Sequence, residues 1–248
     1  MRNKNFITGT QKNNQKIKID DFFTIVILGE NHGYRMKSYG PLPLIKINNN
    51  EALIERQINA IQDTFINFEI ILCTGYESTK TISFIKEKFS DINIRPVENQ
   101  IHYNSNCCES ARLCLNNTTN DNIIICGGGV LLLSSQLSII DFSHSTVITQ
   151  NQMDDSNFEV GVIQNNGKFE QFSLGISNEY WTEIIYLRGL KTINKFSSII
   201  SNMEYKNRFL FEAINELSKS TEIKVHKHNE KPIMKINSIK ILKRIMKI

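Results

Sequence analysis

The chain has 248 residues, of which 40% are hydrophobic and 22% charged. This length and composition are typical of a globular protein with one sizeable core. No apolar run reaches the roughly 18–20 residues of a membrane span, and no hydrophobic signal core is present near the N-terminus. We therefore expect a cytoplasmic protein without a membrane partner. The odd number of cysteines, five, favours reduced thiols, with Cys73 and Cys126 inside core strands.

The charge is unevenly distributed along the chain. Residues 1–20 sum to +4 and residues 219–248 to +7, so the residues between them sum to −7 within a net charge of +4. Basic ends can contact nucleic acid, but the interleaved aromatic residues of a single-strand binding surface are missing. We therefore expect no nucleic-acid partner, and we interpret residues 1–20 as a polar, flexible tail.

The chain is organised around an apolar run that ends in a glycine-containing loop. Residues 24–28 are apolar or β-branched, which is typical of a central parallel strand. Gly29 and Gly33 let the backbone turn tightly and approach a ligand, and Arg35 adds a fixed positive charge. In an open α/β sheet, the loop after the first strand is a usual place for a nucleotide. The predicted nucleotide-binding residues here are Leu28, Gly29, Gly33, Tyr34, Arg35 and Met36.

This loop matches neither of the common phosphate-binding motifs. No Gly-Lys-Ser/Thr follows, as a Walker A loop requires, and the glycine spacing is not that of GxGxxG. By itself the pattern also fits an ordinary strand-to-loop turn.

The segments after the loop alternate between helical and strand patterns. The spacing predicts helices over about 51–66 and 77–89, and strands over 68–74, 92–97 and 122–126. These strands are apolar throughout and their connections are short, which predicts a mostly parallel sheet covered on both faces.

The order of these motifs resembles the nucleotidyltransferases that activate sugar 1-phosphates and phosphocholine. In that family a strand leads into Leu-Ala-Ala-Gly-x-Gly-x-Arg-Met/Phe, then Pro-Lys-Pro-Leu, then Pro-Leu-Ile-Glu-Arg at the start of a helix. Here Pro41–Leu44 reads Pro-Leu-Pro-Leu, and Leu53–Arg56 reads Leu-Ile-Glu-Arg. The resemblance covers about residues 22–248. It implies a Rossmann-like, three-layer α/β/α fold (GT-A-like) with a mostly parallel mixed sheet.

The segment from Glu98 to Leu113 also matches the family, which carries Tyr-Asn-Ser/Asn ahead of a serine that opens a helix. The resemblance implies that this segment and the turn after the second strand bind the nucleotide; the residues concerned are Gly75, Asn104, Ser105 and Ser110. Side-chain amides and helix N-terminal amides can hold a base edge or a phosphate. Capping of helix 109–116 by Asn106 explains the same residues without a ligand, and the two interpretations are compatible.

The family's metal-binding positions are changed in this chain. The aspartate that follows the fourth strand in the family is replaced by Gly129. The later Glu-Ile/Met-Asp motif reads Lys235-Ile-Asn237, and Leu42 stands where the family has the lysine of Pro-Lys-Pro-Leu. A hard cation that bridges phosphate oxygens needs carboxylate ligands. The sequence therefore predicts no metal site at Gly129 and Asn237.

The C-terminal half, residues 144–248, is expected to hold the substrate. Alternating strands are predicted over 145–149, 158–163 and 168–172, with a hairpin turn at Asn165–Gly167. A strand at 181–187, helices over 190–203, 208–217 and 239–246, and a solvent-facing pair His226 and His228 complete the prediction. Residues 21–143 and 144–248 form the two halves of one domain.

Within this half, Tyr180 and Trp181 are the predicted substrate-side residues. Their resemblance to the phosphocholine-specific members favours cytidine, so CTP is the first candidate among the nucleotides.

Three functional hypotheses remain open. In the first, the protein binds a nucleoside triphosphate or nucleotide-sugar, or only a protein partner or a second copy of itself, without efficient transfer. In the second, it is an active cytidylyl- or nucleotidyltransferase that uses Mg²⁺ and phosphorylated small molecules through relocated groups. The groups considered are Glu30 and Arg35 as catalytic residues, Glu98 as a further ligand, and Lys37 or Lys46 as the cation. In the third, it is a glycosyltransferase with Asp154–Asp155 in place of a DxD motif.

Overall fold

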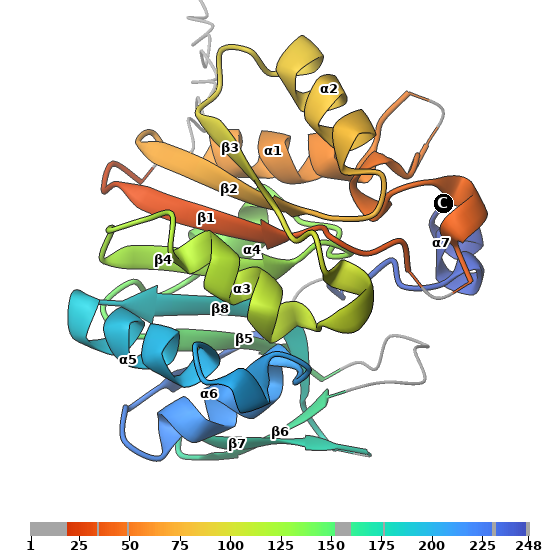
Figure 1. The fold of residues 1–248 in the computed structure, drawn as a ribbon. Helices are drawn as coiled ribbons and strands as arrows, with labels where there is room; N and C mark the ends of the chain where they lie inside the picture. Colours follow the sequence, from red (N-terminus) through yellow and green to blue (C-terminus); the bar gives the residue numbers. More distant parts are fainter. Residues whose placement is uncertain are drawn as a thin grey trace, which may run out of the picture.

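The computed structural model describes residues 19–33, 35–48, 50–151, 160–175, 177–229 and 232–246. Most of the predicted tail, Tyr34 and the Asp154–Asp155 pair lie outside these ranges. The described strands form one nine-stranded sheet in the order β3-β2-β1-β4-β8-β5-β9-β7-β6. Figure 1 shows this sheet running through the molecule with helices on both sides.

The first four strands form the parallel part of the sheet. They are β1 (Phe23–Leu28), β2 (Phe68–Thr74), β3 (Ile94–Glu98) and β4 (Asn122–Gly127). β1 lies between β2 and β4, and β3 pairs with β2, each pair being parallel. β1 is buried along its whole length, because helices cover both faces of the sheet there. The strands predicted from apolar runs are therefore confirmed.

The remaining strands extend the sheet with mixed pairing. They are β5 (Thr146–Gln150), β6 (Val160–Asn165), β7 (Lys168–Leu174), β8 (Tyr180–Arg188) and β9 (Lys224–His228). β8 is antiparallel to β4 and β5, and β9 is parallel to β5. β6 and β7 form the predicted hairpin, in which Asn166 and Gly167 have φ angles of 49° and 78°, as a type I′ turn requires. The mixed sheet is thus parallel mainly in its first half.

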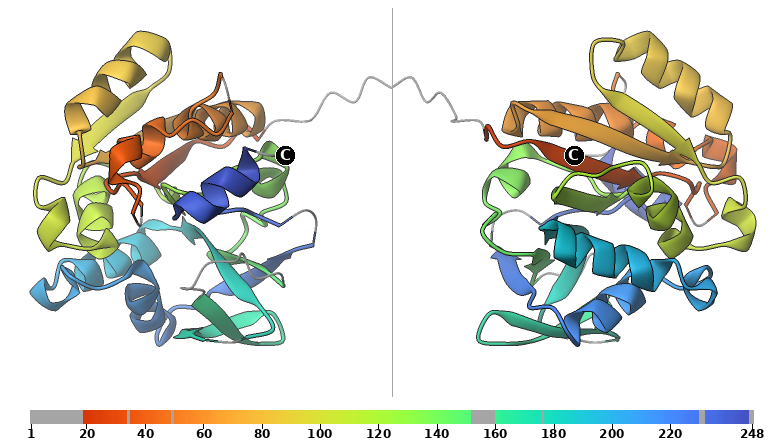
Figure 2. Two further views of the ribbon diagram at one scale, coloured as in Figure 1. Left: turned by 90° about the vertical axis from the view of Figure 1, so that its right-hand side faces the viewer. Right: turned by 60° about the vertical axis from the view of Figure 1, so that its left-hand side comes forward.

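Two groups of helices cover the two faces of the sheet (Figures 1 and 2). One face packs against α1 (Leu53–Thr64), α2 (Ser78–Lys88) and α4 (Ser134–Ser138). The other packs against α3 (Cys107–Leu115), α5 (Leu190–Ile200) and α6 (Leu210–Ser218). The three-layer α/β/α architecture predicted from the sequence is confirmed. No described helix has the length and apolar character that a membrane span requires.

A third, smaller core lies at one edge of the sheet. There α7 (Ile239–Ile245) packs with the short 3-10 turn at Leu42–Leu44 and the start of α1. Three further 3-10 turns occur at Lys37–Tyr39, His102–Asn104 and Met203–Tyr205. This edge core joins residues from the beginning and the end of the chain.

Two expectations about individual residues have different outcomes. Cys73 and Cys126 are 0% and 1% exposed, as predicted for core thiols. The solvent-facing prediction for His228 is wrong, since its side chain is only 4% exposed. His226 is half-buried, and burial lowers its pKa. The alternation of Lys and His residues resembles an edge strand, but β9 lies between β5 and β7 in the sheet.

Candidate active site

The candidate site lies at the carboxyl ends of the four parallel strands. The loops that leave β1, β2, β3 and β4 meet there, and the segment 232–238 crosses the same edge before α7. The left view of Figure 2 looks directly onto this edge, with α7 in front. In open α/β sheets this is the edge at which ligands bind.

The loop after β1 is fixed by close backbone packing. The N–H of Gly29 donates to the carbonyl of Cys73 at 3.1 Å, and a Cβ on Gly29 would lie 2.7 Å from the Pro43 ring. Gly33 has a φ of 74° and lies against the backbone of Asn237, so it requires the left-handed conformation that glycine tolerates. Met36 is fully buried at the end of the loop. The two glycines are therefore needed for the path of the chain.

Leu28 and Arg35 differ in their surroundings. Leu28 closes β1 and is 8% exposed, so it serves the core. Arg35 is exposed and adopts a φ of 56°, which is unusual for a residue with a side chain. Such conformations concentrate at functional sites.

Glu30 is the most unusual residue of this loop. It is 3% exposed, its Oε1 accepts a hydrogen bond from Asn31 at 3.2 Å, and its Oε2 has no hydrogen-bond partner. Burial is the main cause that raises the pKa of this carboxyl group, and nearby Glu183 raises it further. A buried carboxyl group with unused hydrogen-bonding capacity in a binding loop is a functional candidate.

The turn after β2 packs tightly against the same loop. A Cβ on Gly75 would lie 2.7 Å from the carbonyl oxygen of Glu30 and 2.9 Å from the His102 side chain. Nε2 of His102 is buried and has no hydrogen-bond partner. Gly75 therefore lets these two loops approach each other closely.

The segment before α3 forms a network centred on Asn99. Its amide donates to the hydroxyls of Ser105 and Ser110, each at 3.0 Å. Ser110 is fully buried, whereas Asn104 is exposed. The side chain of Asn106 accepts from the N–H of Cys107, so the predicted cap is present, on a helix that begins at Cys107 and not at residue 109. The serines are thus held in place at the carboxyl edge.

Aromatic rings form a rim beside this network. Lys37 Nζ lies 5.8 Å from the ring centre of Tyr76 and 5.9 Å from that of Tyr103. The rings of His102 and Tyr103 are 4.0 Å apart, and Tyr103 is 63% exposed. Lys37, considered above as a relocated cation, is therefore engaged with aromatic faces. An exposed ring at a nucleotide-binding edge offers a surface for stacking.

The turn after β4 leaves no room for side chains. A Cβ on Gly128 would overlap the carbonyl oxygen of Leu28, and one on Gly129 would lie 2.6 Å from the carbonyl oxygen of Ile236. The amide of Gln57 donates to the Val130 carbonyl at 2.9 Å. Backbone groups from three parts of the chain therefore pack directly on one another here.

The residues at the family's metal positions do not fit Mg²⁺. At Gly129 the backbone of Ile236 occupies the space that a side chain would need, and Asn237 carries no charge. Within the described ranges no group of three or more His, Cys, Asp or Glu residues could hold a metal ion. Mg²⁺ is bound in proteins chiefly by carboxylate oxygens and phosphates. We therefore derive no chemical step through a metal at these positions.

An ion pair occupies the same corner of the edge. Lys235 is 3% exposed, and its Nζ lies 3.7 Å from Oε1 of Glu183. Lys235 forms an isolated β-bridge with Val130, directly after the glycine turn. Sequence reasoning did not identify Glu183 as a site residue. The available signal was a charged residue inside the otherwise apolar run of β8.

Three other residues that the sequence predicted for the site do not face the loops at the carboxyl ends of the strands. Tyr180 and Trp181 are 5% and 4% exposed; the Trp181 indole donates to the Ile184 carbonyl at 3.0 Å and packs on Phe172. Both side chains are therefore buried, and that of Trp181 packs in the core. Nζ of Lys46 lies 3.7 Å from Oε2 of Glu55, a residue of α1.

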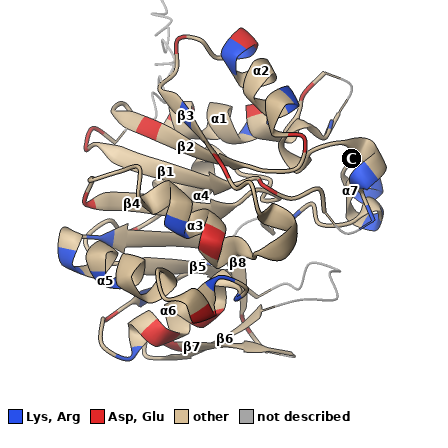
Figure 3. Ribbon diagram, in the orientation of Figure 1, with Lys and Arg blue, Asp and Glu red and all other residues tan. Residues whose placement is uncertain are grey.

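Basic residues gather at the candidate edge. Figure 3 shows Lys and Arg positions along the ribbon of α7, beside the carboxyl ends of the strands. They are Lys240, Lys243 and Arg244. A cluster of one sign of charge raises the local concentration of anionic ligands. The edge is therefore suited to a phosphorylated ligand.

Comparison with known proteins identifies the fold. No protein-family model matches the chain, and no curated protein matches it in sequence. Among solved structures, the chain is similar to the CTP:phosphocholine cytidylyltransferase from Streptococcus pneumoniae, with a TM-score of 0.76, 19% identity, and coverage of 91% of this chain and 98% of that one.

Two further structures are similar over almost the same length. The inositol-1-phosphate CTP transferase from T. maritima has a TM-score of 0.70 at 13% identity, covering 90% of this chain and 95% of that one. A UDP-glucose pyrophosphorylase complexed with UDP-glucose has a TM-score of 0.73 at 10% identity, covering 91% and 97%. The chain therefore has the nucleotidyltransferase fold, as the sequence resemblance predicted.

Proposed function

We infer that this protein binds a nucleoside triphosphate, with CTP as the first candidate, or a nucleotide-sugar at the carboxyl edge, and that it lacks efficient metal-dependent transfer. One observation carries this proposal. The edge keeps glycine turns and buried polar atoms with unused hydrogen-bonding capacity, while the metal positions hold Gly129 and Asn237. Nucleotidyl transfer depends on positioning and on neutralising the charge of the phosphates. Binding groups are present here without the metal carboxylates.

The ligand class is supported by the proteins that share the fold. Their names refer to CTP with phosphocholine, CTP with inositol 1-phosphate, and UDP-glucose. The nucleotides in these names, CTP and UDP-glucose, each combine a base with a chain of phosphates. The exposed Tyr103 ring and the basic α7 offer this protein a stacking surface and positive charge for such a ligand.

Glu30 supports a second candidate function, an active nucleotidyltransferase with relocated groups. Its unpartnered Oε2 lies in the loop after β1. In such an enzyme the Glu30→Ala variant would lose transfer activity. We rank this function second because burial raises the Glu30 pKa and so disfavours the charged form that a metal ion requires. The glycosyltransferase hypothesis has no support among the described residues, since Asp154–Asp155 lie outside them.

Thermal unfolding with CTP, UTP, GTP and ATP, each in EDTA and in Mg²⁺, tests the proposal. A ligand at a hundredfold excess over its dissociation constant stabilises the folded state by about 2.7 kcal/mol. We expect at least one triphosphate to give the same shift in both solutions. No shift with any triphosphate or with UDP-glucose would contradict binding. In parallel, pyrophosphate release with phosphocholine or sugar 1-phosphates as acceptors is expected to stay at background, and release that needs Mg²⁺ would favour the second candidate.

A further inference from the structure

We propose that the ammonium group of Lys235 receives the phosphates of the nucleotide in place of a metal ion, and that Glu183 is its counter-ion until the ligand binds. This inference rests on the proposed function and specifies how that site holds its ligand. Lys235 stands where the related family has an acidic residue, and it lies next to Gly129, where that family has a metal-binding aspartate. The ammonium group of Lys235 thus supplies a positive charge beside Gly129.

The position of Lys235 is set by backbone contacts. The N–H of Ile236 donates to the carbonyl of Gly129 at 2.7 Å, and the N–H of Leu131 donates to the carbonyl of Met234 at 2.8 Å. These two bonds hold Lys235 opposite Val130, at the carboxyl end of β4. Because Gly129 has no side chain, the segment carrying Lys235 lies directly on the turn.

Burial of this ammonium group has an energetic cost. A buried charge is disfavoured unless it is paired and hydrogen-bonded, and an apolar residue at such a position is often at least as stable. At 3% exposure, Lys235 is therefore a poor choice for packing alone. A ligand that carries negative charge gives a reason for its presence, because a lysine binds phosphate as a point charge.

The conformation of Glu183 points in the same direction. It lies in β8 with a φ of 64°, the left-handed region that side-chain-bearing residues rarely adopt in a strand. The pairing of β5 with β8 shifts here, so that three residues of β8, Thr182–Ile184, lie opposite Ile148. Such a bulge re-aims a side chain and is common beside active sites. The bulge presents the Glu183 carboxylate to Lys235.

The contact between the two groups leaves room for competition. Nζ and Oε1 are 3.7 Å apart, longer than a charge-assisted hydrogen bond of about 2.7–2.9 Å. The Glu183 side chain is 41% exposed, whereas that of Lys235 is 3% exposed. A phosphate oxygen that approaches Lys235 more closely can therefore replace the carboxylate, which can move towards solvent.

Isothermal titration of the four triphosphates and of inorganic pyrophosphate, all in EDTA, tests this assignment. We expect Lys235→Met to weaken binding at least tenfold. Glu183→Gln should bind as tightly as the wild type or several-fold more tightly, because the competing carboxylate is gone. The two substitutions are thus expected to change the affinity in opposite directions. If the pair had only a structural role, both substitutions would change the affinity in the same direction.

Two further variants separate a loss of binding from a loss of folded protein. The double variant Lys235→Met/Glu183→Gln removes both charges of this pair and should bind as weakly as Lys235→Met. Lys219→Met is the matched control, because Lys219 pairs with Glu216 at 2.6 Å on the surface of α6 and its loss changes the net charge equally. Melting temperatures without ligand show whether each variant is folded.

The outcomes distinguish this inference from the proposed function. Wild-type protein that binds in EDTA, with equal affinity in both Lys235 variants, overturns the role of Lys235 alone. Binding that requires Mg²⁺ in the wild type also overturns only this inference. If neither the four triphosphates nor UDP-glucose binds the wild type in either solution, the proposed function and this inference both fail.

Discussion

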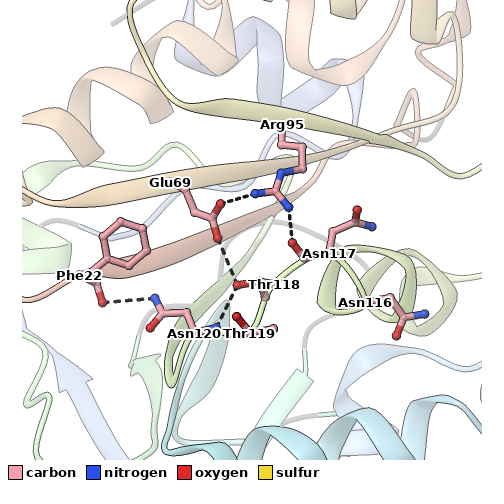
Figure 4. Close-up of a pocket in the computed structure, with 8 residues that line it drawn as sticks. All are labelled: Phe22, Glu69, Arg95, Asn116, Asn117, Thr118, Thr119 and Asn120. Atoms are coloured by element: carbon pink, nitrogen blue, oxygen red, sulfur yellow. Dashed lines mark hydrogen bonds and ion pairs between the residues drawn. The ribbon is translucent and has the colours of Figure 1, made fainter.

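The two ends of the parallel strands differ in whether their buried polar side chains have hydrogen-bond partners. At the amino ends, a hollow of about 660 Å³ opens between the start of β1, the strands β2 and β3, and the loop before β4 (Figure 4). Glu69 there pairs with Arg95 at 2.8 Å and accepts hydrogen bonds from the hydroxyls of Thr24 and Thr118. Its polar side chains hold one another, so the hollow requires no ligand.

The carboxyl ends show the reverse arrangement. The buried atoms Oε2 of Glu30, Oε1 of Gln57, Oε2 of Glu77 and Nε2 of His102 have no hydrogen-bond partner. Leaving such a group unsatisfied costs about 1–3 kcal/mol. Four of them at one edge are explained by a ligand with several polar atoms. Unused hydrogen-bonding capacity, and not the size of a hollow, therefore distinguishes the candidate site.

The largest effect is expected at the glycine turn of the carboxyl end. Gly128→Ala places a Cβ against the carbonyl oxygen of Leu28, which belongs to the central strand and cannot move easily. We expect a loss of about 3 kcal/mol in the free energy of unfolding, measured by urea denaturation. The control is Gly167→Ala, where no atom lies within 4 Å and only the φ of 78° opposes the change, at a cost of about 1–2 kcal/mol. Equal losses would refute the role of close packing.

A change at the amino end is expected to separate stability from binding. Glu69→Ala removes the partner of Arg95 and of two threonine hydroxyls, which should cost about 1–3 kcal/mol of stability. Nucleotide affinity in titrations should stay at the wild-type value. Glu170→Ala, an exposed position on β7, serves as the control, with a change within about 0.5 kcal/mol. Loss of nucleotide binding in Glu69→Ala would assign the hollow a ligand role.

At the carboxyl end, Glu30→Gln should stabilise the protein in a pH-dependent way. Burial raises the pKa of Glu30 above its ordinary value of 4.5, so the folded state binds more protons than the unfolded state. This residue therefore lowers stability progressively as the pH rises from 4.5 through the raised pKa. The variant should melt above the wild type at pH 8 and approach it near pH 4.5, with about 2–4 °C for each kcal/mol. A pH-independent difference would contradict this assignment.

The smallest effect is expected for Lys46→Met. Lys46 is half-exposed and pairs with Glu55 at 3.7 Å; surface pairs of this kind contribute about 0–1 kcal/mol. We expect almost no change in melting temperature and unchanged nucleotide affinity. A marked loss of affinity would instead support the hypothesis that Lys46 acts as the relocated cation.

The fold could be predicted because its signals are local. The apolar run at Phe68–Thr74 gave the limits of β2, and the Asn165–Gly167 turn gave the hairpin. Glycines at positions 29, 33 and 75 could be recognised because only glycine tolerates such close approaches. These features depend on residues that are neighbours in the sequence.

The site was harder to predict because it depends on contacts between distant segments. The sequence placed Lys235 at an acidic position of the family, but only the structure pairs it with Glu183, 52 positions earlier. Trp181 was expected beside a substrate, yet its ring packs on Phe172 inside the second half. Nothing in the local pattern of β8 encodes the bulge that turns Glu183 toward the edge.

The convergence of distant segments at this edge has a consequence for biosynthesis. Gly33 lies against the backbone of Asn237, and Gly129 against that of Ile236, so residues 232–246 complete an edge whose other loops were synthesised first. Under the proposed function, a nascent chain that still holds those residues inside the ribosome could pair its parallel strands but could not retain a nucleotide. Nucleotide capture would then report that translation of this segment is finished.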